Sequence, residues 1–121
     1  MVTLIGMGSG SWEALSAQAQ DAVRRAGLVF GAKRLLAGLP PECTARQFAL
    51  YQPAEILETL AQAPGQDAAV LYSGDTGFYS GASGLLTPLR ALGIPARVYP
   101  GVSSIQLLAA ALGRPWQDWK L

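Results

Sequence analysis

Histidine is missing from this chain of 121 residues, and cysteine occurs once, at Cys43. Without an imidazole there is no Ser-His-Asp or Cys-His nucleophile and no His-ligated metal. A single cysteine excludes an internal disulfide and cannot by itself build a zinc site. We therefore expect chemistry that needs neither imidazole nor metal, and we expect Cys43 to be a small, partly buried side chain.

Charge and long apolar runs are also scarce. Nine Lys and Arg face eight Asp and Glu, so the net charge is +1, and no basic run is present that could follow a phosphate backbone. The apolar runs are far shorter than the roughly 20 residues of a membrane helix, and the chain opens on a strand pattern instead of a charged signal sequence. These absences predict one cytoplasmic domain with no nucleic-acid partner and no membrane partner.

Short apolar runs alternate with helical patterns along the chain. The runs predict strands at residues 2–5, 28–30, 46–50, 68–72 and 96–99. Apolar spacing, caps and breakers predict helices at residues 16–26, 33–37, 53–63, 85–92 and 105–112. Pro88 should kink the fourth helix or make it start late. The alternation predicts an α/β fold, a doubly wound and mostly parallel sheet of about five strands with helices on both faces.

Three glycine-bearing loops follow predicted strands. They read GMGSG at residues 6–10, SGDTG at residues 73–77 and PGVSS at residues 100–104. Because open α/β sheets bind ligands beyond the carboxyl ends of their strands, we expect the three loops to share one site. The alternative is purely structural, since such connections need glycines and helix caps in any protein.

The first loop does not fit a dinucleotide site. Ser11 stands where a third glycine is required, and Phe30 and Gly31 stand where an acid is expected. No Gly-Lys-Ser or Gly-Lys-Thr follows, which excludes a phosphate-binding P-loop. What remains are glycines that allow the backbone to approach a bulky ligand, and Asp75, which can accept hydrogen bonds. This combination suits a nucleoside with a charged tail.

Together, the three loops resemble the amino-terminal domain of the tetrapyrrole (corrin/porphyrin) methylases, which use S-adenosylmethionine. The longer strings GAKRLL, SGDTGFYS and SSIQ, at residues 31–36, 73–80 and 103–106, are most similar to the C5-methylating members, the precorrin-6Y C5,15-methyltransferases and their cobalt-precorrin counterparts. The resemblance runs from Thr3 to about Trp119. Ser9 and Thr76 depart from the family pattern, which usually has proline at both positions. Because a proline ring fixes the backbone angle φ, both loops lack that constraint here.

The resemblance implies methyl transfer from S-adenosylmethionine to a precorrin ring carbon in cobalamin biosynthesis, at C5 and with C15 open as a further position. Because the sulfonium already activates the methyl group, positioning matters more than a dedicated base, and no catalytic residue is assigned. By the family pattern, the cofactor-binding residues are Ser73, Gly74, Asp75, Phe78, Ser103 and Ser104. By the same pattern, Gly8, Ser9 and Gly10 face the tetrapyrrole substrate. Lys33 and Arg34, near the end of the second strand, could meet precorrin carboxylates.

The family folds as two domains that hold the cofactor between them, and residues 1–121 correspond to the first. The resemblance therefore implies a carboxyl-terminal methylase domain as a partner and a homodimer of the full-length protein. We expect the isolated chain to be inactive and to bind S-adenosylmethionine weakly or not measurably. Two alternatives stay open. One is a non-catalytic α/β module that binds a partner domain, and the other is a methylase acting at another ring position or outside the corrins.

Overall fold

The computed structural model describes residues 1–7, 12–73 and 75–99, and within α4 it describes no side chain before Ala82. Five strands form one parallel sheet in the order β3-β2-β4-β1-β5. The strands are β1 (Val2–Gly6), β2 (Leu28–Phe30), β3 (Arg46–Phe48), β4 (Ala68–Tyr72) and β5 (Ala96–Tyr99). The helices are the 3-10 helix η1 (Trp12–Ala14) and the α-helices α1 (Ala17–Arg25), α2 (Lys33–Ala37), α3 (Pro53–Ala61) and α4 (Asp75–Ala91).

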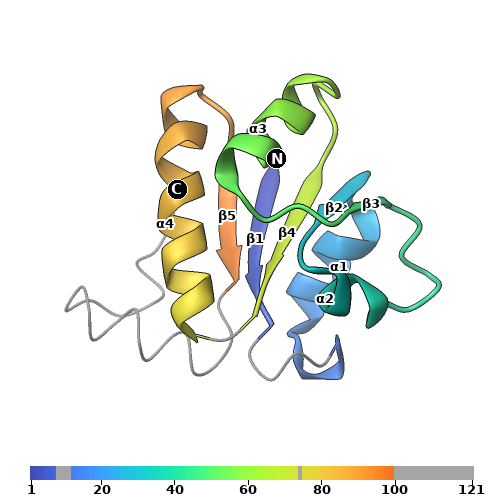
Figure 1. Cartoon of the computed structure of the whole chain (residues 1–121). Coiled ribbons are helices and arrows are strands. Elements are labelled where there is room, and N and C mark those ends of the chain that lie inside the picture. The colour runs from blue at the N-terminus through green and yellow to red at the C-terminus, as the bar shows by residue number, and fades with distance from the viewer. Residues whose placement is uncertain (8–11, 74, 100–121) are drawn as a thin grey trace.

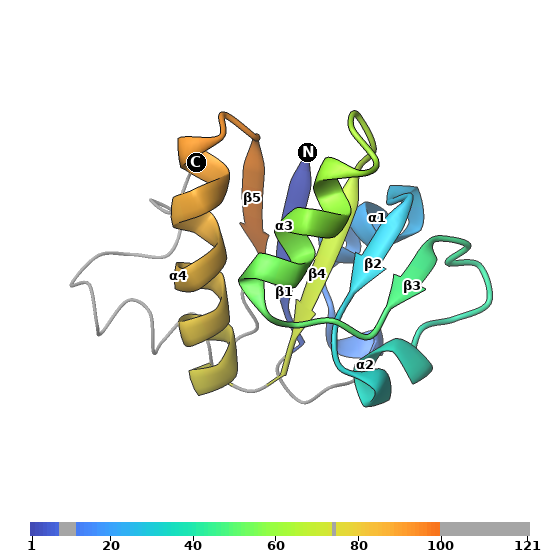
Figure 2. The same ribbon diagram turned by 45° about the horizontal axis from the view of Figure 1, so that its top comes forward.

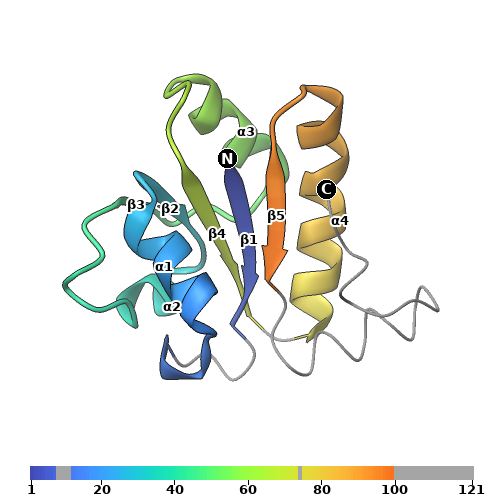
Figure 3. The same ribbon diagram turned by 180° about the vertical axis from the view of Figure 1, so that it is seen from behind.

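Helices cover both faces of the sheet, as expected for a doubly wound fold. Figure 1 shows α3 and α4 in front of the strands, and Figure 3 shows α1 and α2 on the opposite face. Side chains alternate along each strand, so Leu4 and Val70 pack in the core under α3 and α4, while Ile5 and Leu71 pack in the core under α1 and α2. The predicted fold class is confirmed. In the described residues, no helix is long and apolar enough to cross a membrane.

Local sequence signals place several helix ends. The Ser16 hydroxyl accepts a hydrogen bond of 3.2 Å from the Ala19 N–H at the start of α1. Pro53 is the first residue of α3, where a missing N–H costs nothing. Gly93 follows α4 with φ +71°, a conformation that glycine adopts without strain. These predicted caps and stops are confirmed.

The expected late start of the fourth helix is wrong. α4 begins at Asp75 and runs through Pro88, so only Ser73 and Gly74 separate it from β4 (Figure 2). The predicted SGDTG loop is therefore two residues long, and its last three residues belong to the helix. The helix passes through Pro88 because Leu85 and Leu89 are fully buried in the core, and this burial outweighs the cost of proline in a helix. The buried Ala82 extends the same core contact towards the start of α4.

Candidate functional site

The carboxyl ends of three neighbouring strands lie at the same edge of the sheet. Gly6 at the end of β1 is paired with Tyr72 at the end of β4, and Ile5 is paired with Tyr99 at the end of β5. The Met7 N–H also donates a hydrogen bond of 2.8 Å to the Tyr72 carbonyl. In Figure 1 these ends point to the bottom of the view. The prediction that the three glycine-bearing segments follow strands that end at one edge is confirmed for the three strand ends.

The chain diverges to opposite faces at the central pair of these strands. After β1 it continues to η1 and α1, which pack on one face, and after β4 it continues to α4, which packs on the other. Two adjacent parallel strands whose connections part in this way leave a crevice beyond their carboxyl ends, the usual ligand position of open α/β sheets. We call this place, bounded by Met7 and Ser73, the β1/β4 crevice.

Two buried side chains anchor the connection on the β1 side. Met7 and Trp12 are both buried in the core under α1, on either side of residues 8–11. The Gln20 side-chain amide donates a hydrogen bond of 3.0 Å to the Trp12 carbonyl, and the Arg24 guanidinium lies 5.5 Å from the centroid of the Trp12 ring. Sequence reasoning missed these anchors, although apolar residues flanking a glycine loop were a visible signal. The predicted substrate residues Gly8, Ser9 and Gly10 lie outside the described residues.

On the β4 side, the crevice begins with a buried phenol and a half-buried serine. Tyr72 packs in the core under α3 and α4, and burial raises the pKa of its phenol well above the usual value, so Tyr72 is neutral at any physiological pH. Ser73 is half-buried at the edge itself. Asp75 and Phe78 lie three residues apart at the start of α4, and we describe only their backbone. Gly74, and likewise Ser103 and Ser104, lie outside the described residues.

The end of β2 adds positive charge to the same edge. Gly31 packs closely on Leu71, since a Cβ at Gly31 would lie 3.2 Å from the Leu71 Cβ. Lys33 and Arg34 follow at the start of α2, where both are exposed, and no ion pair to either is found among the described residues. Two cationic side chains therefore follow the carboxyl end of β2, the strand next to β4.

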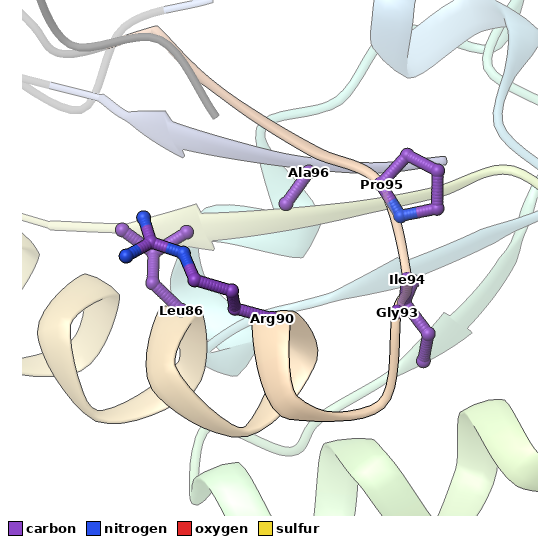
Figure 4. A pocket seen from close by; sticks show the side chains of 6 residues that line it. All are labelled: Leu86, Arg90, Gly93, Ile94, Pro95 and Ala96. Atoms are coloured by element: carbon purple, nitrogen blue, oxygen red, sulfur yellow. The ribbon is translucent and has the colours of Figure 1, made fainter.

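Two pockets in the described part of the chain lie elsewhere. One, of about 200 Å³, lies where the chain turns from α4 into β5 and is lined by Leu86, Arg90 and residues 93–96 (Figure 4). The other, of about 260 Å³, lies on the opposite face between α1 and β5. Neither contains Met7 or Ser73, so neither is the β1/β4 crevice. The described residues also hold no group of three or more His, Cys, Asp or Glu side chains placed to bind a metal.

Comparison with known proteins identifies the family to which this chain is similar. The family described as Tetrapyrrole (Corrin/Porphyrin) Methylases matches residues 1–121. A precorrin-4 C(11)-methyltransferase of Rhodococcus erythropolis is 32% identical over 120 residues, which cover 93% of this chain and 48% of that protein. A cobalt-precorrin-7 C(5)-methyltransferase of Salmonella typhimurium is also 32% identical over 120 residues, covering 98% of this chain and 58% of that protein.

Solved structures agree with the fold. A uroporphyrin-III C-methyl transferase from Thermus thermophilus, solved in complex with S-adenyl homocysteine, superimposes with a TM-score of 0.61 at 28% identity. The superposition covers 91% of this chain and 47% of that one. The chain thus spans about half the length of the curated relatives and solved structures that it matches.

Proposed function

Because this chain belongs to the tetrapyrrole (corrin/porphyrin) methylases, a family that uses S-adenosylmethionine, we propose that it supplies one wall of a methyltransferase site of cobalamin biosynthesis. The observation that carries this proposal is that the chain leaves the paired ends of β1 and β4 towards opposite faces of the sheet. Ser73 follows β4 at this point, and α4 begins at Asp75.

The residues of the crevice suit a nucleoside that carries a positive charge. Gly74 lets the backbone approach the ligand closely, and the Asp75 carboxylate can accept hydrogen bonds from ribose hydroxyls or from the ammonium of the methionine part. We assign cofactor contacts to Ser73, Gly74, Asp75 and Phe78, with Ser103 and Ser104 on the other side.

The cofactor, when bound, supplies an activated methyl group on a sulfonium. The part of this chain is to hold that group in line with a nucleophilic ring carbon and to keep water away, and neither task needs a histidine. With the cofactor bound, a carbon–carbon bond would form as the sulfur–methyl bond breaks, S-adenosylhomocysteine would leave, and the positive charge passed to the ring would be lost as a proton to solvent. We assign the facing tetrapyrrole contacts to Gly8, Ser9 and Gly10, with Lys33 and Arg34 pairing with peripheral carboxylates of the substrate.

Within the family, we propose methylation at precorrin C5. The support is the similarity of residues 31–36 and 73–80 to the C5-methylating members, together with the Salmonella typhimurium relative named for that position. Methylation at C11 is the second candidate, because the Rhodococcus erythropolis relative is equally identical. Incubation of the two-domain protein with precorrin-6B and with precorrin-4, followed by NMR of the methylated product, separates the two. A product methylated only at C11 would overturn the C5 assignment.

A pair of aspartates tests the cofactor assignment. Asp75 follows the carboxyl end of β4, whereas Asp67 precedes its amino end and is exposed beside the Met1 amino group. Asp75→Ala should weaken S-adenosylmethionine binding at least tenfold, about 1.4 kcal/mol, because hydrogen bonds to charged groups are lost. Asp67→Ala should leave binding unchanged, and Gly74→Val should block it. Calorimetry on the two-domain protein that finds equal affinity for the two aspartate variants would reject the assignment.

We also propose that this chain needs a second, carboxyl-terminal half for catalysis and for tight cofactor binding. One wall leaves the ligand open to water and supplies only part of the contacts. Transfer of a labelled methyl group should be undetectable with the 121-residue chain alone and should appear when the matching carboxyl-terminal half is supplied. Equal turnover by the chain alone would show that the second half is dispensable.

A further inference from the structure

The pocket at the turn from α4 into β5 lies at the edge of the sheet opposite to the β1/β4 crevice. It has a volume of about 200 Å³ and is lined by Leu86 and Arg90 of α4 and by residues 93–96 (Figure 4). Because β5 begins at Ala96, this pocket lies where the parallel strands begin, whereas the crevice lies where they end. The methyl transfer proposed above therefore makes no use of it.

The turn that forms one wall of this pocket is held in place by backbone hydrogen bonds. The Ile94 N–H donates to the Leu89 carbonyl at 3.0 Å, and the Gly93 N–H donates to the Arg90 carbonyl at 3.1 Å. With Gly93 at φ +71°, these two bonds form the Schellman ending of a helix. The wall is thus formed before any ligand arrives, so binding costs little ordering of the backbone.

Two hydrogen-bond donors border the pocket. The Arg90 side chain is exposed, and no ion pair or hydrogen bond of its guanidinium is found among the described residues. The second donor is the Ala96 N–H. The Pro95 carbonyl accepts a bond of 2.9 Å from Val2 of β1, and the C=O and N–H of a trans peptide point to opposite sides, so the Ala96 N–H points away from β1. In the described part of the chain no strand pairs with that side of β5.

We propose that this pocket binds a small carboxylic acid with a compact apolar body, such as an aromatic or branched-chain carboxylate. Leu86, Ile94 and Pro95 supply apolar walls for the body. The carboxylate accepts hydrogen bonds from the Arg90 guanidinium and the Ala96 N–H. Because the pocket is smaller than the roughly 300–1,000 Å³ of sites for drug-sized ligands, the ligand has the size of about one ring. A phosphate suits the pocket less, since apolar walls would leave its further oxygens without donors.

Benzoate is the probe for this proposal. It is titrated into the 121-residue chain at constant ionic strength and followed by the amide signals in NMR. The Gly93 and Ala96 signals should shift and saturate, with a dissociation constant of about 1 mM or tighter. Benzamide keeps the ring but lacks the charge, and acetate keeps the charge but lacks the ring, so each should bind at least tenfold more weakly. S-adenosylmethionine is absent from this titration, so its result is independent of the proposed function.

Two arginines give matched variants. Arg90→Gln should weaken benzoate binding at least tenfold, whereas Arg97→Gln should leave it unchanged, because the exposed Arg97 lines the other pocket. Ala96→Val, which suits a strand and narrows the pocket, should weaken binding without removing a charge. Equal affinity for the two arginine variants, equal binding of benzoate and benzamide, or shifts that do not saturate by about 20 mM benzoate would overturn the proposal.

Discussion

Gly31 tests whether close contact between β2 and β4 positions the edge of the sheet that holds the β1/β4 crevice. A Cβ at this position would lie 3.2 Å from the Leu71 Cβ and 3.3 Å from the Leu71 carbonyl oxygen, closer than buried atoms usually approach. Among the described residues, positive φ values are found at Gly65 and Gly93, so at Gly31 the obstacle is space and not backbone conformation. Gly31→Ala should therefore destabilise the fold by about 1–3 kcal/mol, the usual cost of overpacking.

At Gly84 the same glycine-to-alanine substitution should change the stability of the fold in the opposite direction. It lies exposed within α4, and a Cβ there would meet only the Pro53 Cγ at 3.4 Å, an ordinary contact. Gly84→Ala should stabilise the fold by roughly 0.5–1 kcal/mol, because alanine loses less backbone entropy in a helix. Urea unfolding followed by circular dichroism measures both as shifts of the midpoint at constant slope. If Gly31→Ala were as stable as the parent, or less damaging than Gly84→Ala, the packing argument would be refuted.

Three further results are expected. Ser16→Ala should cost about 1 kcal/mol in urea unfolding because α1 loses its cap, and Ser16→Asp should restore most of it. Leu85→Ala should cost about 2–5 kcal/mol, whereas Leu92→Ala, at a side chain 65% exposed, should change stability by less than about 0.5 kcal/mol. Because the pKa of Tyr72 is raised on folding, its contribution to stability is complete below pH of about 10, the usual tyrosine value, and falls as the pH rises further. Near pH 10.5 Tyr72 should still be neutral in the folded parent, so the folded Tyr72→Phe variant should show the same phenolate absorbance as the folded parent. After unfolding, the variant should show less phenolate absorbance than the parent, because it has one tyrosine fewer. A loss in the folded state would contradict the burial argument.

Local signals in the sequence determined most elements of the fold. The predicted bounds of β2, α2 and β4 are those observed, because each is a short apolar or amphipathic run closed by glycine, proline or polar residues. The edge strand β3 ends two residues before its predicted end, at Phe48. The parallel, doubly wound class followed from the alternation of these elements.

Only the tertiary structure decided where α4 begins and what borders the crevice. The helix extends before its predicted start, where Ala82 is buried, and it passes through Pro88 with Leu85 and Leu89 buried, contacts between distant parts of the chain that local propensity does not contain. The pairing of Gly6 with Tyr72 likewise joins residues far apart in the sequence, and it makes β1 and β4 direct neighbours, whereas the sequence predicted only that their ends share one edge. The anchors Met7 and Trp12 emerged in the same way, because burial depends on which helix covers which face of the sheet.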